Sequence, residues 1–295
     1  MKRAAQKAIT YGLYPALLAA VLAVIVITVD NHGNYSKIYG IVTLALVVIL
    51  MATEAIFPLS AGWKMTGRSF WRDLRYIAID IPAVALTNLA FGWLAIFYSE
   101  RFPGFLKGAP VWLSVFAYLI TFEFFQYWYH RLSHTGKGPV GRFFWRVHLA
   151  HHLPDRVYVL MHAVFNPING AIAAMIIQFP LIALGIDPAA AFAATLIIGF
   201  QGLVSHFNVD VRAGWLNYFF IGTETHRYHH SAAIEEAQNY GVALTIWDLV
   251  FGTFYYTPGR APEKLGVDQP AEYPASENIL RVLQLPFKKK HPRRI

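Results

Sequence analysis

The sequence contains no cysteine, and this absence removes several kinds of site at once. Disulfide bonds, iron–sulfur clusters, thiolate-bound haem and cysteine zinc sites all require that side chain. Charged residues are also scarce, at 14% of 295 residues, whereas hydrophobic residues make up 56%. This composition is too apolar for an ordinary soluble domain. No break in composition separates the two halves, so we expect residues 1–295 to form a single membrane domain.

The positive charge also lacks the pattern that nucleic-acid binding requires. The net charge is +8, but the basic residues lie at the termini and in short loops instead of forming a stripe. This distribution is typical of membrane topology and of contact with anionic headgroups. We therefore expect no nucleic-acid partner.

Long apolar runs predict an all-α polytopic membrane protein, because about 20 apolar residues span a bilayer. Four transmembrane helices are expected at about residues 8–29, 38–58, 77–98 and 109–129. Two further apolar runs, separated by Asp187-Pro188, predict a helical hairpin that dips into the membrane and returns. Charged residues are costly in lipid, so Glu54, Asp80 and Glu123 are expected to face protein or lie near an interface.

Basic residues orient these helices in the membrane. Segments 1–10 and 59–76 hold seven Lys and Arg residues, whereas segments 30–37 and 99–108 hold three. By the positive-inside rule, the N-terminus is cytoplasmic. Four crossings then return the chain to the cytoplasmic side near Tyr129.

Three histidine boxes carry the chemistry. The first is an H-x3-H motif, and the second and third are H-x2-H-H motifs; their histidines are His130, His134, His148, His151, His152, His226, His229 and His230. Spacings of three and four residues place side chains on one face of a helix. Eight imidazoles exceed the needs of one ion and suit two metal ions with about four to six ligands each. Imidazole binds iron, zinc, copper and nickel, so the ligand type leaves the metal open.

Two histidines outside the boxes also enter the predicted site. The hairpin returns His206 to the same side of the membrane as the boxes, which makes it a ninth candidate ligand. His162, at the entry of the hairpin, is a candidate tenth ligand. Metal-bound imidazoles usually donate their other ring N–H to an acceptor. Asp155, Glu224, Asn239 and Asp248 are candidates by proximity to a box, and Glu123 is a further candidate for supporting the site.

The boxes resemble those of the fatty acid hydroxylase superfamily, also called the sterol desaturase family. Asn239-Tyr-Gly and Trp247-Asp-x-x-Phe-Gly-Thr-Phe also resemble its C-terminal signature, and the likeness covers about residues 120–256. The resemblance implies that the eight box histidines and His206 are metal ligands in a cytoplasmic helical cap. Some members carry a second histidine four residues after the one that His206 matches. Here that position is Asp210, which either ligates or supports a metal, or caps the hairpin.

The resemblance also implies an activity. Members are membrane di-metal enzymes that use two iron ions and O2 to hydroxylate or desaturate lipids. We therefore expect a lipid monooxygenase of the fatty acid hydroxylase type, with zinc as an alternative metal in purified protein. No catalytic residue is expected beyond the metal centre. The sequence shows no flavin, haem or nicotinamide motif of its own, so electrons would come from a separate ferredoxin, cytochrome b5-like protein or reductase.

Other interpretations stay open. A desaturase would use the same boxes, and a non-catalytic metal transporter or bis-histidine haem carrier would also contain histidines. Haem needs only two axial histidines, and transport favours polar residues near the bilayer midplane. One motif is a coincidence: Gly136-x-Gly138-x-x-Gly141 matches the dinucleotide fingerprint, but no strand precedes it and Pro139 lies inside it. We expect a loop there, with no cofactor bound.

Overall fold

The computed structural model describes residues 2–99, 101–102 and 104–288. Its described residues are helical and irregular, with extended pairing limited to isolated bridges, so the all-α prediction is confirmed. The long helices are α1 (Lys2–Asp30), α2 (Tyr35–Ile56), α3 (Gly67–Ser99), α4 (Val111–Thr135), α5 (Gly138–His152), α6 (Pro167–Leu184) and α7 (Pro188–Ser205). The short helices are α8 (Thr223–His229), α9 (Ile246–Val250) and α10 (Ile279–Leu283). Single 3-10 turns are η1 (Ala61–Trp63), η2 (Val159–Ala163), η3 (Gly214–Tyr218), η4 (Pro270–Glu272) and η5 (Leu285–Phe287).

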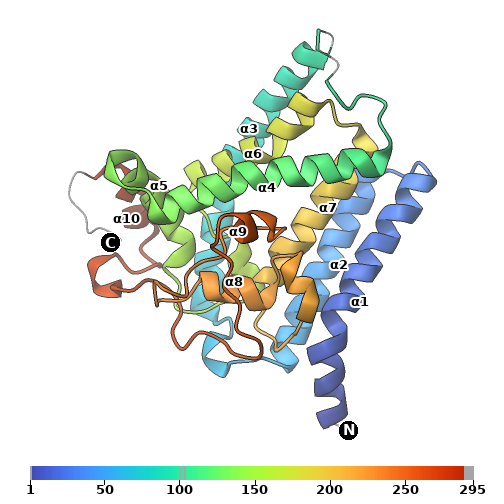
Figure 1. Cartoon of the computed structure of the whole chain (residues 1–295). Coiled ribbons are helices and arrows are strands. Elements are labelled where there is room, and N and C mark those ends of the chain that lie inside the picture. The colour runs from blue at the N-terminus through green and yellow to red at the C-terminus, as the bar shows by residue number, and fades with distance from the viewer. Residues whose placement is uncertain (1, 100, 103, 289–295) are drawn as a thin grey trace.

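Five helices, α1, α2, α3, α6 and α7, are long and apolar enough to cross a membrane. They mark the chain as a membrane protein, and they include three of the four predicted spans and both hairpin helices. Helix α4 is not among the five, and it lies across α7 instead of along it (Figure 1). The exact number of crossings therefore stays a prediction.

Helix α7 is the central element of the apolar bundle. It packs against α1, α2 and α4, and its side chains supply much of the larger core, including Phe192, Leu196 and Phe200. Asn166 and Asp187 precede the hairpin helices at their N-caps, and each helix then has proline in its first turn. Gly185, at φ +68°, ends α6 in the left-handed conformation that favours glycine. These local signals make the predicted hairpin.

The acidic residues within the apolar helices face protein, as expected. Glu54 is buried and accepts a hydrogen bond from the backbone N–H of Val159. Asp80 lies against Gly170, where an added Cβ would come within 2.0 Å of its carboxylate. Glu123 is fully buried and accepts from backbone N–H groups in the loop that follows Tyr240. Each carboxylate therefore joins two elements of the bundle.

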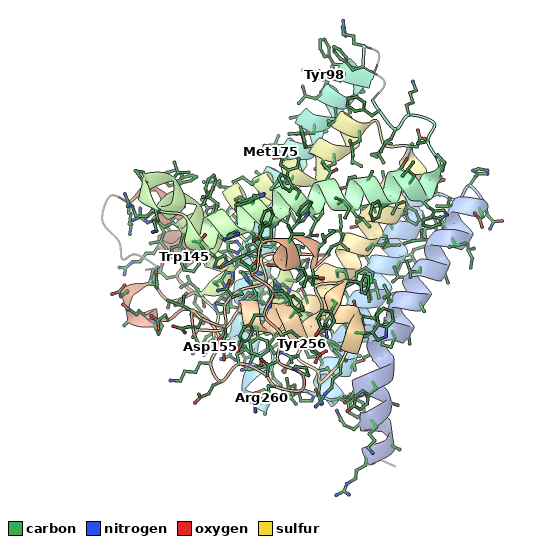
Figure 2. The ribbon with its side chains drawn as sticks, viewed as in Figure 1. Tyr98, Trp145, Asp155, Met175, Tyr256 and Arg260 are labelled. Carbon is green, nitrogen blue, oxygen red and sulfur yellow. The ribbon has the colours of Figure 1, made fainter. Side chains whose placement is uncertain are left out.

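The region that covers the histidines differs from the predicted helical cap. After α7, the chain to Lys288 is mostly irregular, and its α-helices have only five to seven residues. Figure 2 shows this region, which carries Tyr256 and Arg260, well away from Tyr98 at the far end of α3. Buried Arg227 stabilises the irregular segment after α7, because it donates to the backbone carbonyls of Phe207 and Val209.

Candidate metal centre

The first two histidine boxes meet because α4 and α5 approach closely at two glycines. A Cβ on Gly141 would lie 2.0 Å from the carbonyl carbon and oxygen of Gly136, so neither position tolerates a larger residue without movement. Gly138 opens α5 at φ +71°. The predicted loop is therefore limited to Gly136 and Lys137, and Gly138 and Gly141 of the same motif lie in the first turn of α5.

The nine predicted histidines divide into two groups without remainder. The five-histidine group contains His130, His134, His148, His152 and His229, and the four-histidine group contains His151, His206, His226 and His230. Within each group, the candidate ligand atoms all lie within 4.8 Å of one another, and every member is buried. The groups are adjacent, since the rings of His152 and His230 stack with centroids 4.4 Å apart.

Helical spacing explains how the second and third boxes each serve both groups. In α5, His148 and His152 are one turn apart and enter the five-histidine group, while His151 turns towards the other. In the third box, His226 and His230 enter the four-histidine group and His229 the five-histidine group. The repeated H-x2-H-H motif is therefore the pattern that links two adjacent sites.

His206 reaches the site because α7 ends there. The Thr223 hydroxyl donates to the carbonyl of Val204, which fixes the start of α8 against the end of α7. The His206 Nε2 atom then lies 3.1 Å from the Nε2 atoms of both His151 and His226. The structure thus places His206 among the box histidines.

The distances between ring nitrogens fit metal ligands. The Nε2 atoms of His130 and His152 each lie 3.0 Å from Nε2 of His148. Two nitrogens at right angles around one ion, each about 2.1 Å from it, are about 3.0 Å apart. Five further Nε2 pairs within the two groups, at 3.1–3.2 Å, agree with the same arrangement.

The short distance between Nε2 of His130 and Nε2 of His148 is not a hydrogen bond between neutral rings, because each ring uses its hydrogen at Nδ1. Nδ1 of His130 lies 2.8 Å from the carbonyl oxygen of Tyr240, and Nδ1 of His148 lies 3.0 Å from Oδ1 of Asn169. Both acceptors are oxygens, so each neutral imidazole carries its hydrogen on Nδ1 and a lone pair on Nε2. Two lone pairs therefore face each other at 3.0 Å. A cation between them would convert this repulsion into attraction.

Burial keeps the rings in the form that binds metals. It is the main cause that lowers the pKa of His151, His152, His206, His226 and His230 well below the usual value, and neighbouring histidines lower each further. Neutral imidazole is the ligand form, so no proton need be removed at neutral pH.

The acceptors of the ring N–H groups differ from the predicted ones. Besides Tyr240 and Asn169, they are the carbonyls of Gln238 for His229 and of Gly202 for His206. Asp248 instead accepts from the N–H groups of Tyr240 and Gly241. It therefore supports the site indirectly, by holding the loop whose Tyr240 carbonyl contacts His130. Burial raises the pKa of Asp248 to about 6.

The other three predicted acceptors also lie elsewhere. Glu224 accepts from Asn217 and the N–H of Ala213, and Asn239 bonds the backbone of Thr225 and Tyr255. Asp155, labelled in Figure 2, is exposed. It pairs with Arg156. Proximity to a histidine box did not identify the acceptors, because most of the ring N–H groups bond to backbone carbonyls, which no sequence motif reveals. Asn169 could have been identified from the sequence, because it is a polar amide within the uncharged helix α6.

Two further candidates lie outside both groups. The His162 ring is 5.2 Å from that of His206 and packs against Gly202, where an added Cβ would meet it at 2.5 Å. Asp210 forms an ion pair with Arg212 at 3.3 Å, which agrees with the hairpin-end role.

An apolar cavity of about 930 Å³ leads to the histidines. One face of α7, marked by Thr195, Gly199, Gly202 and His206, lines it from the metal centre towards Pro188. That stretch of helix is about 27 Å long at 1.5 Å per residue. Tyr35, Tyr39, Phe122, Ile177 and Leu181 are among the other lining residues. Such a cavity suits a long hydrocarbon chain better than a compact polar ligand.

Comparison with known proteins agrees with the site. Residues 115–253 match the family model described as "Fatty acid hydroxylase". The chain is 27% identical over 297 residues to the ornithine lipid hydroxylase OlsE of Rhizobium tropici, covering 96% of this chain and 85% of that protein. It is 28% identical over 162 residues to the fatty acid hydroxylase vlmA of Lecanicillium sp, covering 48% of this chain and 42% of that protein. No solved structure matches.

The matched segment runs from within α4 to three residues after α9, so it contains both histidine groups. The match to OlsE extends over nearly the whole chain, including the apolar N-terminal helices. On these grounds the chain is similar to the fatty acid hydroxylase superfamily over the segment that carries both histidine groups.

Proposed function

We propose that this protein is an O2-dependent di-iron hydroxylase that inserts one oxygen atom into a C–H bond of a membrane lipid. The observation that supports this proposal most directly is that an apolar cavity ends at two buried histidine groups. The cavity is lined by members of both groups, His130 and His148 from one and His151, His206 and His226 from the other. A hydrocarbon chain in it would end beside both candidate ions.

The five-histidine group would hold one iron ion and the four-histidine group the other. When bound, iron supplies the oxidising reactivity that attack on an unactivated C–H bond requires. The protein's own contribution is geometric. Tyr240, Gln238, Gly202 and Asn169 fix which ring nitrogen faces the metal, and the fully buried Glu123 and Asp248 hold the loop that carries the Tyr240 carbonyl.

Side chains around the groups exclude water on the side away from the cavity. Trp145 is buried, and its ring centroid lies 5.3 Å from that of His134; Tyr240 packs 5.7 Å from the same ring. The cavity is thus an open approach to the site. Its far end includes Ser36 and Tyr39, which are exposed among the apolar helices, so a lipid tail would enter from the bilayer.

The substrate is proposed to be an acyl-chain lipid, because the cavity is long and apolar. OlsE is named for hydroxylating an ornithine lipid, which makes aminolipids the first substrates to examine. One oxygen atom of O2 enters the lipid and the other leaves as water, so each turnover consumes two electrons and two protons. We propose that a separate ferredoxin, cytochrome b5-like protein or reductase supplies the electrons.

The proposed topology places the N-terminus and the histidine groups on the cytoplasmic side. The structure supports a shared side, since the N–H of Arg212, six residues after His206, donates to the carbonyl of Thr10 near the start of α1. Basic residues concentrate in that first segment and around the start of α3, which favours the cytoplasm by the positive-inside rule.

Lipid analysis with isotopically heavy dioxygen tests the proposal. A bacterial host expressing the intact protein should accumulate a lipid that has gained one labelled oxygen atom. The His229→Ala variant, expressed to the same level, should not. A new double bond without added oxygen would indicate a desaturase instead. Identical lipids from cells with the protein, with the variant and with neither would contradict catalysis.

A further inference from the structure

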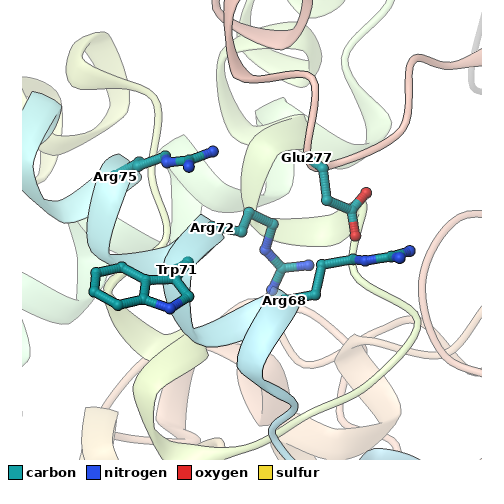
Figure 3. A pocket seen from close by; sticks show the side chains of 5 residues that line it. All are labelled: Arg68, Trp71, Arg72, Arg75 and Glu277. Carbon is teal, nitrogen blue, oxygen red and sulfur yellow. The ribbon is translucent and has the colours of Figure 1, made fainter.

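A second cavity, of about 420 Å³, lies at the start of helix α3, and it shares no lining residue with the cavity at the histidines. Arg68, Trp71, Arg72 and Arg75 line it from the first turns of the helix, and Glu277 lines it from the C-terminal segment (Figure 3). The arginines are spaced four and three residues apart, so they share one face of α3. Three guanidinium groups therefore border one hollow.

Arg72 forms a fixed wall of this cavity. Its side chain is only 4% exposed, and its guanidinium is paired with Asp73 at 2.7 Å. It also donates to the hydroxyls of Tyr158 and Ser276 at 2.8 and 3.0 Å. The charge of Arg72 is thus balanced and its orientation set by neighbours. It shapes the cavity but leaves little charge for a ligand.

Arg68 and Arg75 supply the free positive charge. Both are exposed, and among the described residues neither forms an ion pair with a carboxylate. Glu277 provides the one opposing charge on the lining, so two cationic groups outnumber one anionic group once Arg72 and Asp73 cancel. The cavity is therefore biased towards an anion. Guanidinium groups bind phosphate oxygens particularly well, because their donors match the geometry of the anion.

The position of the cavity indicates where the anion comes from. Helix α3 is one of the five membrane-spanning candidates, and the cavity lies on its first three turns. Trp71 lies beside the arginines with 61% of its surface exposed, and tryptophan is typical of the headgroup level of a bilayer. Figure 3 shows the Trp71 indole on the same stretch of helix, with Glu277 approaching from another segment.

We propose that this cavity binds the phosphate of an anionic membrane-lipid headgroup. Arg68 and Arg75 would bind the phosphate oxygens, Arg72 would form the wall, and Trp71 would lie against the glycerol and upper acyl region. This site is distinct from the proposed substrate cavity, and it does not depend on the hydroxylase activity.

Lipid binding to the purified full-length protein in neutral detergent tests the proposal, with native mass spectrometry as the readout. Dioleoyl phosphatidylglycerol should bind more tightly than dioleoyl phosphatidylcholine. Arg68→Gln and Arg75→Gln should each weaken phosphatidylglycerol binding about tenfold, as loss of a charge-assisted hydrogen bond predicts. Glu277→Gln should act in the opposite direction and tighten binding, because it removes the opposing charge.

Lys64→Gln is the matched control, since Lys64 is an exposed cation just before α3 that does not line the cavity. It should change binding less than threefold. An equal loss in Lys64→Gln and Arg75→Gln would overturn the site in favour of general surface charge. Weaker binding in Glu277→Gln would overturn it as well. Inorganic phosphate that binds as tightly as phosphatidylglycerol would overturn the lipid as the source of the anion.

Discussion

The two histidine groups differ in how the protein supports them. In the five-histidine group, oxygens of Tyr240, Asn169 and Gln238 accept from the rings of His130, His148 and His229. Among the described residues, only His206 of the four-histidine group has such a partner, and Nδ1 of His151, His226 and His230 is buried without a hydrogen bond to any of them. One group is thus held by hydrogen bonds, and the other mainly by the packing of α7 and α8.

This difference indicates that the two proposed ions are not equivalent. Hydrogen bonds to the free ring nitrogen orient a ligand and raise its basicity, and their loss typically costs 10–100-fold in metal affinity. The five-histidine group also has one more ligand. We therefore expect it to bind its ion more tightly, and the four-histidine group to exchange its ion more readily.

Removing one ligand from each group should produce the largest effects, and unequal ones. His230→Ala leaves three histidines in its group, and the purified variant should contain one iron ion per chain with hydroxylation reduced to background. His134→Ala leaves four histidines, so this variant should retain two ions while still losing most activity. Elemental analysis and labelled-lipid analysis measure both. Equal metal loss in the two variants would remove the proposed asymmetry.

Chelation of the wild-type protein sharpens the same comparison. Graded treatment with a chelator should remove iron in two stages, from two ions to one and then to none. The first stage should be at least tenfold faster or occur at tenfold lower chelator, because the four-histidine group has fewer ligands and fewer hydrogen-bonded rings. A single concerted loss would show that the two groups are supported equally.

Asn169→Leu tests whether the hydrogen-bonded rings explain the tighter group. It removes the oxygen that accepts from His148 and from the hydroxyl of Tyr129, so metal affinity should fall 10–100-fold in the five-histidine group. Asn88→Leu is the matched control, because it removes an amide from the same cavity that bonds Gln178 instead. Competition with a fluorescent chelator should detect the change only in Asn169→Leu.

The smallest expected effect concerns the cavity and leaves both groups loaded. Gly199→Leu places a side chain in the cavity, where even a Cβ would lie 3.3 Å from the Tyr39 hydroxyl. Turnover of long-chain lipids should fall about tenfold while two ions remain bound, as one or two lost methylene contacts predict. Gly92→Leu, at a helix position open to space, should leave turnover unchanged. Loss of iron in Gly199→Leu would assign the residue to the metal centre instead.

Much of this arrangement was predictable from sequence. Apolar runs predicted the long helices, and Asp187-Pro188 predicted the hairpin that returns His206 to the boxes. The i, i+3, i+4 spacing of the histidines predicted that they share helix faces. The number of imidazoles predicted enough ligands for two metal ions. These features depend on local periodicity and on hydrophobic length, both of which are written directly in the chain.

The remainder depends on long-range contacts that local patterns do not encode. Which histidine joins which group follows from the angle at which α4, α5 and α8 meet. The ring acceptors are mostly backbone carbonyls in irregular loops, and Asp248 reached the site only through the N–H groups of Tyr240 and Gly241. The orientation of α4 was not predicted, because its hydrophobic and aromatic residues were taken for a membrane span, although α4 is not among the five helices that are long and apolar enough to cross a membrane.

Crystallographic anomalous scattering at the iron edge tests the central claim most directly. Iron-loaded protein should give two peaks per chain, one among His130, His134, His148, His152 and His229, and one among His151, His206, His226 and His230. A single peak, or peaks outside these groups, would contradict the proposed di-iron centre.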